Sequence, residues 1–270
     1  MTDPLGTNTA ALGGPFSPAN GVPTGSNTST GSSSPPVVTG NSLIFTSASS
    51  QYLSATGKTS INQQKFTIAA WFKTSTVALA DIFDFSDGTT ANRIEFLLNS
   101  TTQIQFIGTT ANSTIAGLVT SASFADGNWH HVMVAVDTTQ ATNTNRLLLY
   151  VDGALVALSS STYPAQNTNL SNNFAATYDI GSRNGTARFF NGKLAQVYYI
   201  DGQQLTPSSF ISGTPGVPIT YTGAYTGTFD FFLSFSNGAS TTTLGLDSSG
   251  EGNNWTLNNM TTANQSTDYP

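Results

Sequence analysis

The chain of 270 residues contains no cysteine, so no disulfide framework can stabilise it, and its stability must come from packing and strand pairing. Charged residues are scarce, at 8% of the total, and acidic groups outnumber basic ones by 14 to 8. The formal charge of -6 argues against a surface that binds nucleic acid or another polyanion. Hydrophobic residues make up 38%, which is enough to fill one large all-β domain or two small ones.

Signals for export or membrane insertion are also missing. The N-terminus, "MTDPLGTNTAALGG", has neither a basic region nor an apolar region. No stretch of about 18 consecutive apolar residues occurs anywhere in the chain. We therefore expect a soluble protein that is at first cytoplasmic.

Residues 1–40 differ in amino-acid composition from the rest of the chain. They are nearly all Gly, Ser, Thr, Asn, Pro and Ala, with Asp3 the sole charge and Phe16 the sole aromatic residue. Such a segment cannot bury enough apolar area to offset the entropy lost on ordering. We interpret it as an extended docking arm that is ordered by a larger assembly, and we expect residues 41–270 to form the folded domain.

Short apolar or alternating runs from residue 41 onward predict β-strands. In residues 103–107, Ile104 and Phe106 alternate with glutamines, which is typical of a half-buried strand. Asp-Gly or Asn-Gly dipeptides at 87, 126, 152, 184, 191, 201 and 237 supply the positive φ angles of tight turns. "RLLLYVDGALVAL" predicts a hairpin, whereas only "LTPSSF" predicts a helix, with Thr206 as its cap and Pro207 at its first position. This pattern indicates an all-β antiparallel sandwich or jelly roll.

Five segments in order resemble a known family. They are "LIFTSASSQYLSA" (43–55), "FTIAAWFK" (66–73), "DGNWHHVMVAVD" (126–137), "LLLYVDGALVA" (148–157) and "YDIGSRNGTARFFNGKLAQVYYIDGQQLTPSSF" (178–210). Together they resemble the laminin G-like jelly rolls of the concanavalin A-like lectin/glucanase superfamily. The resemblance implies two packed, curved antiparallel sheets with a groove on the concave face. Members bind glycans or proteins, often with calcium, and a minority are glycoside hydrolases.

The C-terminal part departs from the usual family order. Residues 229–259 are similar to a segment that normally precedes the "LIF...YL" strand. Either the domain is circularly permuted and this segment completes the same sandwich, or the segment starts a second unit. We favour permutation because only 60 residues follow position 210. The same tail pattern resembles jelly rolls in the virion surface and fibre proteins of tailed bacteriophages.

The two histidines, His130 and His131, are neighbours in a predicted strand. Adjacent strand residues point to opposite faces, so the two rings cannot bind one metal ion. We therefore interpret the pair as structural. The resemblance implies a core strand in which Trp129 packs and a histidine is satisfied by hydrogen bonds.

Catalytic acids are not evident. Glycoside hydrolysis needs two carboxyl groups about 5 to 10 Å apart. The chain has only two glutamates, Glu95 and Glu251, and it lacks the E-x-D-x-(x)-E motif of the hydrolases that it resembles. "RIEF" places Glu95 as the polar residue of an alternating strand. No catalytic residue is predicted, although an aspartate pair stays open.

Calcium is a possible ligand but not a required one, since hard oxygen donors gather in two loops. The candidate metal ligands are Asp81, Asp84 and Asp87 in "DIFDFSDG", and Asp247, Glu251 and Asn253 in "DSSGEGNN". The alternative for the second loop is an ordinary turn, in which the aspartate accepts backbone hydrogen bonds.

A glycan site would combine an aromatic platform with amide and charged groups in loops. The candidates are Phe174, Arg183, Asn184, Asn254 and Trp255. The alternative is that these are solvated loops and one core tryptophan. Tyr198 and Tyr199 point to opposite faces of a strand, so we expect at least one of them to pack in the core.

Two hypotheses follow for function. The first is a non-enzymatic phage virion surface protein, either capsid decoration or fibre, which docks on virion structural proteins through residues 1–40 and displays a lectin-like jelly roll for glycan or host-surface adhesion. The alternative is a carbohydrate-active module, either a free lectin or a polysaccharide hydrolase, or else a bacterial adhesin fragment. Neither nucleic acid nor membrane is an expected partner, and an oligomer is possible.

Overall fold

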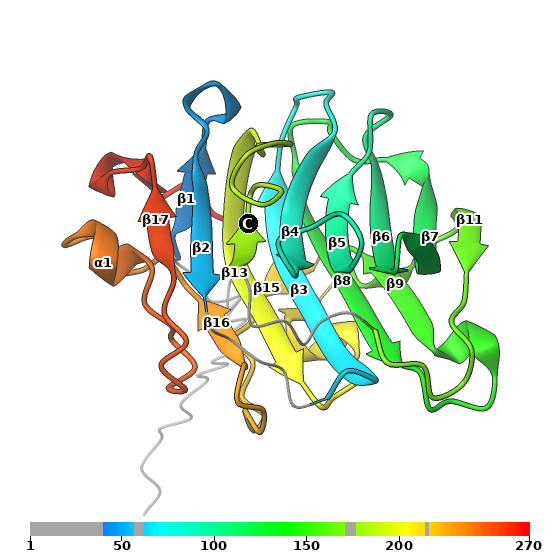
Figure 1. Ribbon diagram of the computed structural model, residues 1–270. Helices are drawn as coiled ribbons and strands as arrows, with labels where there is room; N and C mark the ends of the chain where they lie inside the picture. The colour runs from blue at the N-terminus through cyan, green and yellow to red at the C-terminus, as the bar shows by residue number, and fades with distance from the viewer. Residues whose placement is uncertain (1–39, 57–61, 171–176, 214–215) are drawn as a thin grey trace, which may run out of the picture. The chain divides into compact units, whose positions relative to one another are not determined.

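Two antiparallel sheets of eight strands each form the fold in the computed structural model (Figure 1). The structure describes residues 40–56, 62–170, 177–213 and 216–270, so the predicted docking arm lies outside it except for residue 40. Sheet A has the order β10 (Ala154–Leu155), β9 (Leu147–Val151), β8 (Trp129–Asp137), β3 (Lys65–Lys73), β13 (Gly192–Asp201), β1 (Ser42–Phe45) and β18 (Gln265–Ser266), and β16 (Phe231–Leu233) also pairs with β13.

Sheet B has the order β11 (Leu158–Thr162), β7 (Ser113–Ser123), β6 (Gln103–Thr110), β5 (Arg93–Leu98), β4 (Ala80–Ser86), β12 (Thr177–Ile180), β2 (Tyr52–Thr56) and β17 (Thr256–Asn258). A small hairpin joins β14 (Ile211–Ser212) to β15 (Val217–Pro218). The predicted all-β antiparallel sandwich is confirmed. Among the described residues, no helix has the length and apolar character needed to cross a membrane.

Strand alternation divides the buried side chains into two layers. On β8, Val132, Val134 and Val136 point into the main core between the sheets. Met133 and Ala135 point the other way, into a second apolar layer on the outer face of sheet A, where Phe210 and Tyr221 cover them. We call the face of each sheet that is turned away from the other sheet its outer face. Both faces of β8 are therefore buried, which explains its continuous apolar sequence.

Several local predictions agree with the structure. On β6, Ile104 and Phe106 are buried, and Gln103 and Gln105 are only partly so. The predicted hairpin turns between β9 and β10 at Asp152 and Gly153, whose φ angles are 49° and 82°.

The helical elements agree less well with the sequence patterns. Residues Pro207–Ser209 form one 3-10 turn with proline at its start, but Thr206 does not cap it through its side chain. The sequence patterns missed the helix α1 (Thr241–Leu244), which a capping box at Ser240 begins. The other 3-10 turns are Ser47–Ser49, Asn143–Asn145 and Thr262–Asn264.

The C-terminal segment joins the same two sheets. Strand β16 pairs with β13, β17 pairs with β2, and β18 pairs with β1. In Figure 1 the orange-red β17 accordingly lies beside the blue β2. Phe229, Phe231 and Trp255 pack into the main core. Residues 229–266 thus contribute to the sandwich rather than to a separate unit.

Candidate functional site

A row of carboxylates crosses the outer face of sheet B. Asp179 of β12 lies directly opposite Asp84 of β4, which in turn lies opposite Glu95 of β5. The neighbours of each residue along its strand, such as Tyr178 and Phe85, point into the core. Like charges directly opposite each other destabilise a sheet, so this row needs compensation from nearby positive groups.

Asp81 joins the row because of an irregularity in β4. On a regular strand Asp81 and Asp84, three residues apart, would point to opposite faces. The register between β4 and β5 shifts between Asp81 and Phe83, and this bulge places both aspartates on one side. Carboxylate oxygens of Asp81, Asp84 and Glu95 lie within 4.8 Å of one another. The sequence patterns missed Glu95 as a member of this group.

Residues 181–191, which we call the clamp loop, are bound to this row. The backbone N–H of Asn184 donates to Asp84 Oδ2 at 2.9 Å, and the backbone N–H of Asp81 donates to the carbonyl of Arg188 at 3.0 Å. The loop turns at Asn184 and Gly185, which have φ angles of 50° and 61°, as the Asn-Gly dipeptide predicts. A tight turn therefore fixes the height of this loop above the sheet.

Three guanidinium groups balance the carboxylates. Glu95 Oε1 lies 3.2 Å from Arg93 Nη1, 3.4 Å from Arg183 Nε and 2.9 Å from Arg188 Nη1. Arg188 Nη1 also lies 3.6 Å from Asp81 Oδ1. Two of the three arginines belong to the clamp loop, so the network holds that loop against the sheet.

The aspartates of the row are buried, and burial favours their neutral form. Burial, assisted by the charge of Glu95, raises the pKa of Asp84 to about 6, although the hydrogen bond from Asn184 opposes this. Burial and the charge of Asp84 raise the pKa of Asp179 to about 7. Burial also raises the pKa of Asp81, whose two carboxylate oxygens make no hydrogen bond with the described residues.

This cluster fits calcium poorly. Asp81 and Asp84, both predicted as calcium ligands, do converge, and with Glu95 they form the only described group of three or more acidic, His or Cys side chains close enough to share an ion. However, three guanidinium groups already contact Glu95, and a divalent cation would add its charge beside them in a buried site. Asp87, the third predicted ligand, is not part of the cluster, because its carboxylate accepts hydrogen bonds from Thr89 and Asn92 in a turn.

The second predicted calcium loop is closed by its own hydrogen bonds. Asp247 accepts from the backbone N–H groups of Phe232, Ser249 and Asn253 at 2.9 Å each. The amide of Asn253 donates to the carbonyl of Asp230 at 2.7 Å, and Glu251 is exposed. The loop is thus the ordinary turn that was the alternative, and its three candidate ligands do not converge on an ion site.

The predicted glycan residues are distributed differently from the expectation. Arg183 and Asn184 face the carboxylate row rather than solvent, since they bond to Glu95, Asp84 and Ser86. Trp255 is wrong as a sugar platform because only 3% of it is exposed and its ring packs on Phe231. Asn254 is exposed, and its Oδ1 accepts from the backbone of Asp247. Phe174 lies outside the described residues.

The two histidine rings point to opposite faces, as predicted. His131 is buried between Trp71 and Phe210, and burial lowers its pKa to about 3, so that the ring is neutral. Neither of its ring nitrogens has a hydrogen-bond partner among the described residues. His130 is the histidine that hydrogen bonds satisfy: its ring nitrogens lie 2.8 Å from Asp152 Oδ2 and 3.1 Å from Asp126 Oδ1.

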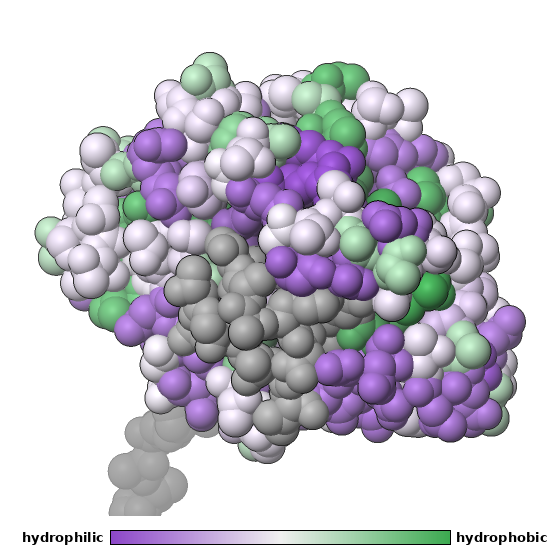
Figure 2. All heavy atoms as spheres, viewed as in Figure 1, coloured by the Kyte–Doolittle hydropathy of each residue, from purple (hydrophilic) through white to green (hydrophobic). Residues whose placement is uncertain are grey.

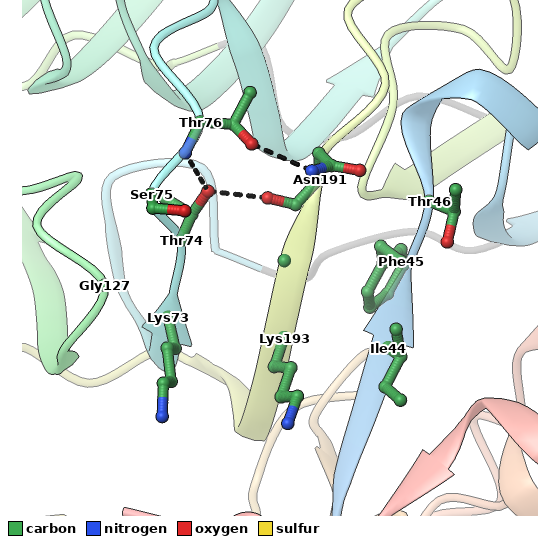
Figure 3. A pocket seen from close by; sticks show the side chains of 11 residues that line it. Ile44, Phe45, Thr46, Lys73, Thr74, Ser75, Thr76, Gly127, Asn191 and Lys193 are labelled. Carbon is green, nitrogen blue, oxygen red and sulfur yellow. Dashed lines mark hydrogen bonds between the residues drawn. The ribbon is translucent and has the colours of Figure 1, made fainter.

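A pocket of about 360 Å³ opens where β1, β3 and β13 meet the loops at their ends (Figure 3). Thr74 Oγ1 donates to the carbonyl of Asn191 at 2.6 Å, and the Asn191 amide donates to Thr76 Oγ1 at 2.8 Å. Lys73 and Lys193 line the same pocket. Its volume lies within the range of about 300–1,000 Å³ that is usual for small-molecule sites. Sequence patterns could not reveal it, because its walls come from strands far apart in the chain.

The surface of the molecule is predominantly polar in the view of Figure 2, where hydrophobic residues form small separate patches. The most exposed large hydrophobic residues, Val77 and Leu155, are 71% and 62% exposed and come from different parts of the chain. This face therefore favours polar ligands over a broad apolar partner.

Comparisons with solved structures find similar folds at low sequence identity. A candidate carbohydrate-binding protein from Bacteroides ovatus is 15% identical with a TM-score of 0.57, and the match covers 86% of this chain and 61% of that one. The heptameric SAP-like pentraxin of Limulus polyphemus is 14% identical with a TM-score of 0.48, covering 70% of this chain and 91% of that one. Domains LG4-5 of the mouse laminin α1 chain are 14% identical with a TM-score of 0.46, and the match covers 68% of this chain and 48% of that one.

By sequence, no curated protein matches the chain significantly. The family model described as the concanavalin A-like lectin/glucanases superfamily, of laminin G type, matches residues 45–209, which is more than half of the chain. The matched region runs from the end of β1 to the 3-10 turn after β13 and so contains most strands of both sheets. The chain therefore belongs to the laminin G-like branch of the concanavalin A-like lectin/glucanase superfamily.

Proposed function

We propose that this chain is a non-catalytic carbohydrate-binding module. The observation that carries the proposal is the pocket between β1, β3 and β13, which presents hydroxyl, amide and ammonium groups on a lectin-like sandwich. Sugars are recognised by such polar groups held on rigid elements. The Bacteroides ovatus structure, itself a candidate carbohydrate-binding protein, adds support at the level of the fold.

A binding role is favoured over hydrolysis by the state of the carboxylates. A glycosidase needs two carboxyl groups that reach both sides of the scissile bond. Asp81, Asp84 and Glu95 are at most 4% exposed, and Glu95 is engaged by three arginines. These groups lie under the clamp loop and cannot reach a polysaccharide.

The pocket can be tested with a substitution that fills it. Ser75 is exposed at its wall, so Ser75→Trp should lower the affinity for the best ligand of a glycan array at least tenfold. Ser100→Trp, at an exposed turn between β5 and β6, is the matched control and should bind as the wild type does. Isothermal calorimetry measures both affinities. Equal binding by Ser75→Trp would exclude this pocket, and release of reducing sugar by the wild type would exclude a non-catalytic role.

The biological setting that we propose is the surface of a phage particle. The support is the composition of residues 1–40, which have a single charged and a single aromatic residue and suit a segment that orders on a partner. The arm would attach the module to virion structural proteins, and the sandwich would face the glycans of the host cell. The module would be made in the host cytoplasm and act on the virion surface.

Particle binding tests this setting. A chain that begins at residue 41 should fold but fail to co-sediment with particles that lack the protein, whereas the full chain should co-sediment. Co-sedimentation of both chains would overturn the anchoring role of the arm.

A further inference from the structure

Lys73 and Lys193 form a cationic pair on the outer face of sheet A. The two residues are direct cross-strand partners on β3 and β13, so their side chains lie on the same face. Their neighbours Phe72 and Leu194 point into the main core, which places the lysines on the opposite side. Figure 3 shows both side chains extending in the same direction from the pocket. Trp129 of β8 follows in the same row, opposite Lys73.

These groups bind one carboxylate from the C-terminal part of the chain. Asp268 Oδ2 accepts from Lys73 Nζ at 3.0 Å and from Lys193 Nζ at 2.7 Å. Asp268 Oδ1 accepts from Trp129 Nε1 at 3.0 Å. Two ammonium groups and an indole N–H thus form a receptor for a carboxylate. Together they donate to both of its oxygens.

The receptor keeps a positive charge and stays accessible. Two lysines share a single aspartate, whereas the three arginines around Glu95 are matched by several carboxylates. The side chains of Lys73, Lys193 and Asp268 are 33%, 25% and 35% exposed. These side chains are partly open to solvent, so an external anion can reach the two ammonium groups and compete with Asp268 for them. The charge of the whole chain is -6, so the sign of this local pair is opposite to that of the chain as a whole.

We propose that the pocket binds a glycan through an acidic sugar, whose carboxylate replaces Asp268 between Lys73 and Lys193. The inference rests on the carbohydrate-binding function proposed above and names its substrate class. Asp268 then acts as an internal competitor that a carboxylate-bearing sugar displaces and a neutral sugar does not. The side chains of Ser75, Thr76 and Asn191 lie in the same pocket, where they can meet the sugar hydroxyls. The negative charge of the chain favours a glycan with isolated acidic sugars over a continuous polyanion.

The experiment compares one acidic oligosaccharide with its neutral form. The probes are aldotetraouronic acid, in which xylotriose carries one methylglucuronate, and the methyl ester of the same compound. The wild type should bind the acid at least tenfold more tightly than the ester. Lys193→Met should remove this difference, and Lys65→Met, elsewhere on the same sheet in an ion pair with Asp137, should keep it.

Asp268→Asn separates competition from a purely structural role. Without the internal carboxylate, the acid should bind at least threefold more tightly, while the affinity for the ester stays unchanged. Unchanged or weaker binding of the acid by the folded variant would overturn the inference. In the wild type, the indole N–H resonance of Trp129 should shift as the acid is added, because Asp268 leaves it, and a resonance that does not move while the acid binds would also overturn it.

The failure of this inference differs from the failure of the proposed function. If array glycans bind and Ser75→Trp abolishes their binding, but acid and ester bind equally, the carbohydrate-binding function stands and the acidic specificity falls. If no glycan binds in the pocket, both fall.

Discussion

Asp179 shows how one residue ties the stability of this protein to pH. Its carboxylate is buried and hydrogen-bonds to no described side chain, and its cross-strand partner on β4 is another acid, Asp84. Burial and that neighbour raise its pKa to about 7, against about 3.9 for an unfolded aspartate. Between these two values the folded state holds a proton that the unfolded state has lost. The contribution of Asp179 to folding is therefore intact at low pH and is lost as the pH rises toward 7.

Asp179→Asn should remove this loss. We expect the difference in unfolding free energy, variant minus wild type, to increase by at least about 1 kcal/mol between pH 4.5 and 8, which is about 2–4 °C in Tm for a domain of this size. Thermal unfolding followed by circular dichroism across that range measures it.

Asp87→Asn provides the control for this measurement. A hydrogen bond from Thr89 lowers the pKa of Asp87, so its contribution is already complete above the unfolded pKa and is lost only as the pH falls below it. The difference in unfolding free energy between Asp87→Asn and the wild type should stay constant between pH 5 and 8. A flat curve for Asp179→Asn as well would show that Asp179 titrates normally.

At the level of single residues, the sequence predicts which face a side chain occupies but not which distant groups it meets. The opposite faces of His130 and His131 follow from strand geometry and agree with the structure. Asp81 and Asp84 share a face only because β4 contains a bulge, which no alternation pattern reports. Two of the three arginines that balance this cluster, Arg183 and Arg188, come from a loop about 100 residues later, so the nature of the cluster could not be predicted.

Gly192, the first residue of β13, illustrates how an element can depend on a missing side chain. Its φ angle is 152°, and a Cβ atom there would collide with the backbone carbonyl oxygen of Lys73 on β3. Backbone atoms in the middle of a sheet cannot move aside cheaply. The close approach of β13 to β3 in this region, which also brings Lys193 beside Lys73, therefore requires glycine.

Gly192→Ala should separate these two strands. Gly202→Ala, at the other end of β13, has a φ angle of 74° and nothing within 4 Å, so it should lose only about 1–2 kcal/mol from the left-handed backbone. Gly192→Ala should lose about 1–3 kcal/mol more than this because of the overlap. Urea denaturation of both variants measures the difference. Equal losses would show that the strands adjust without cost.

Most strands could be predicted because their buried faces impose alternation or continuous apolar runs, as on β6 and β8. The short elements could not be predicted from the sequence. Helix α1 has four residues and depends on the cap at Ser240 rather than on periodicity. The pocket depends on how the ends of β1, β3 and β13 are set relative to one another, and this arrangement arises only from tertiary packing.

The folded unit as a whole depends on its last 42 residues, 229–270. These residues supply β16, β17 and β18, and they place Phe231, Leu244 and Trp255 in the main core. Without them, β1 and β2 would become exposed sheet edges beside an open core. Unpaired edges of this kind promote aggregation.

A chain that ends at residue 228 should therefore be insoluble or unfold without a cooperative transition. A chain that begins at residue 41 should unfold cooperatively, because residues 38–270 make up one compact unit. Differential scanning calorimetry distinguishes the two cases. A sharp transition for the chain 1–228 would mean that the remaining strands suffice.

The pairing of β1 with β18 also sets a time order on synthesis. Ser42 meets Ser266 across these strands, so the outer edge of β1 stays unpaired until residue 266 has been translated. Long-range pairing of this kind is slow, and early strands that wait for late partners are open to wrong associations. The sandwich cannot close before β18 has left the ribosome, so the yield of native protein depends on what shields its first strands during that interval.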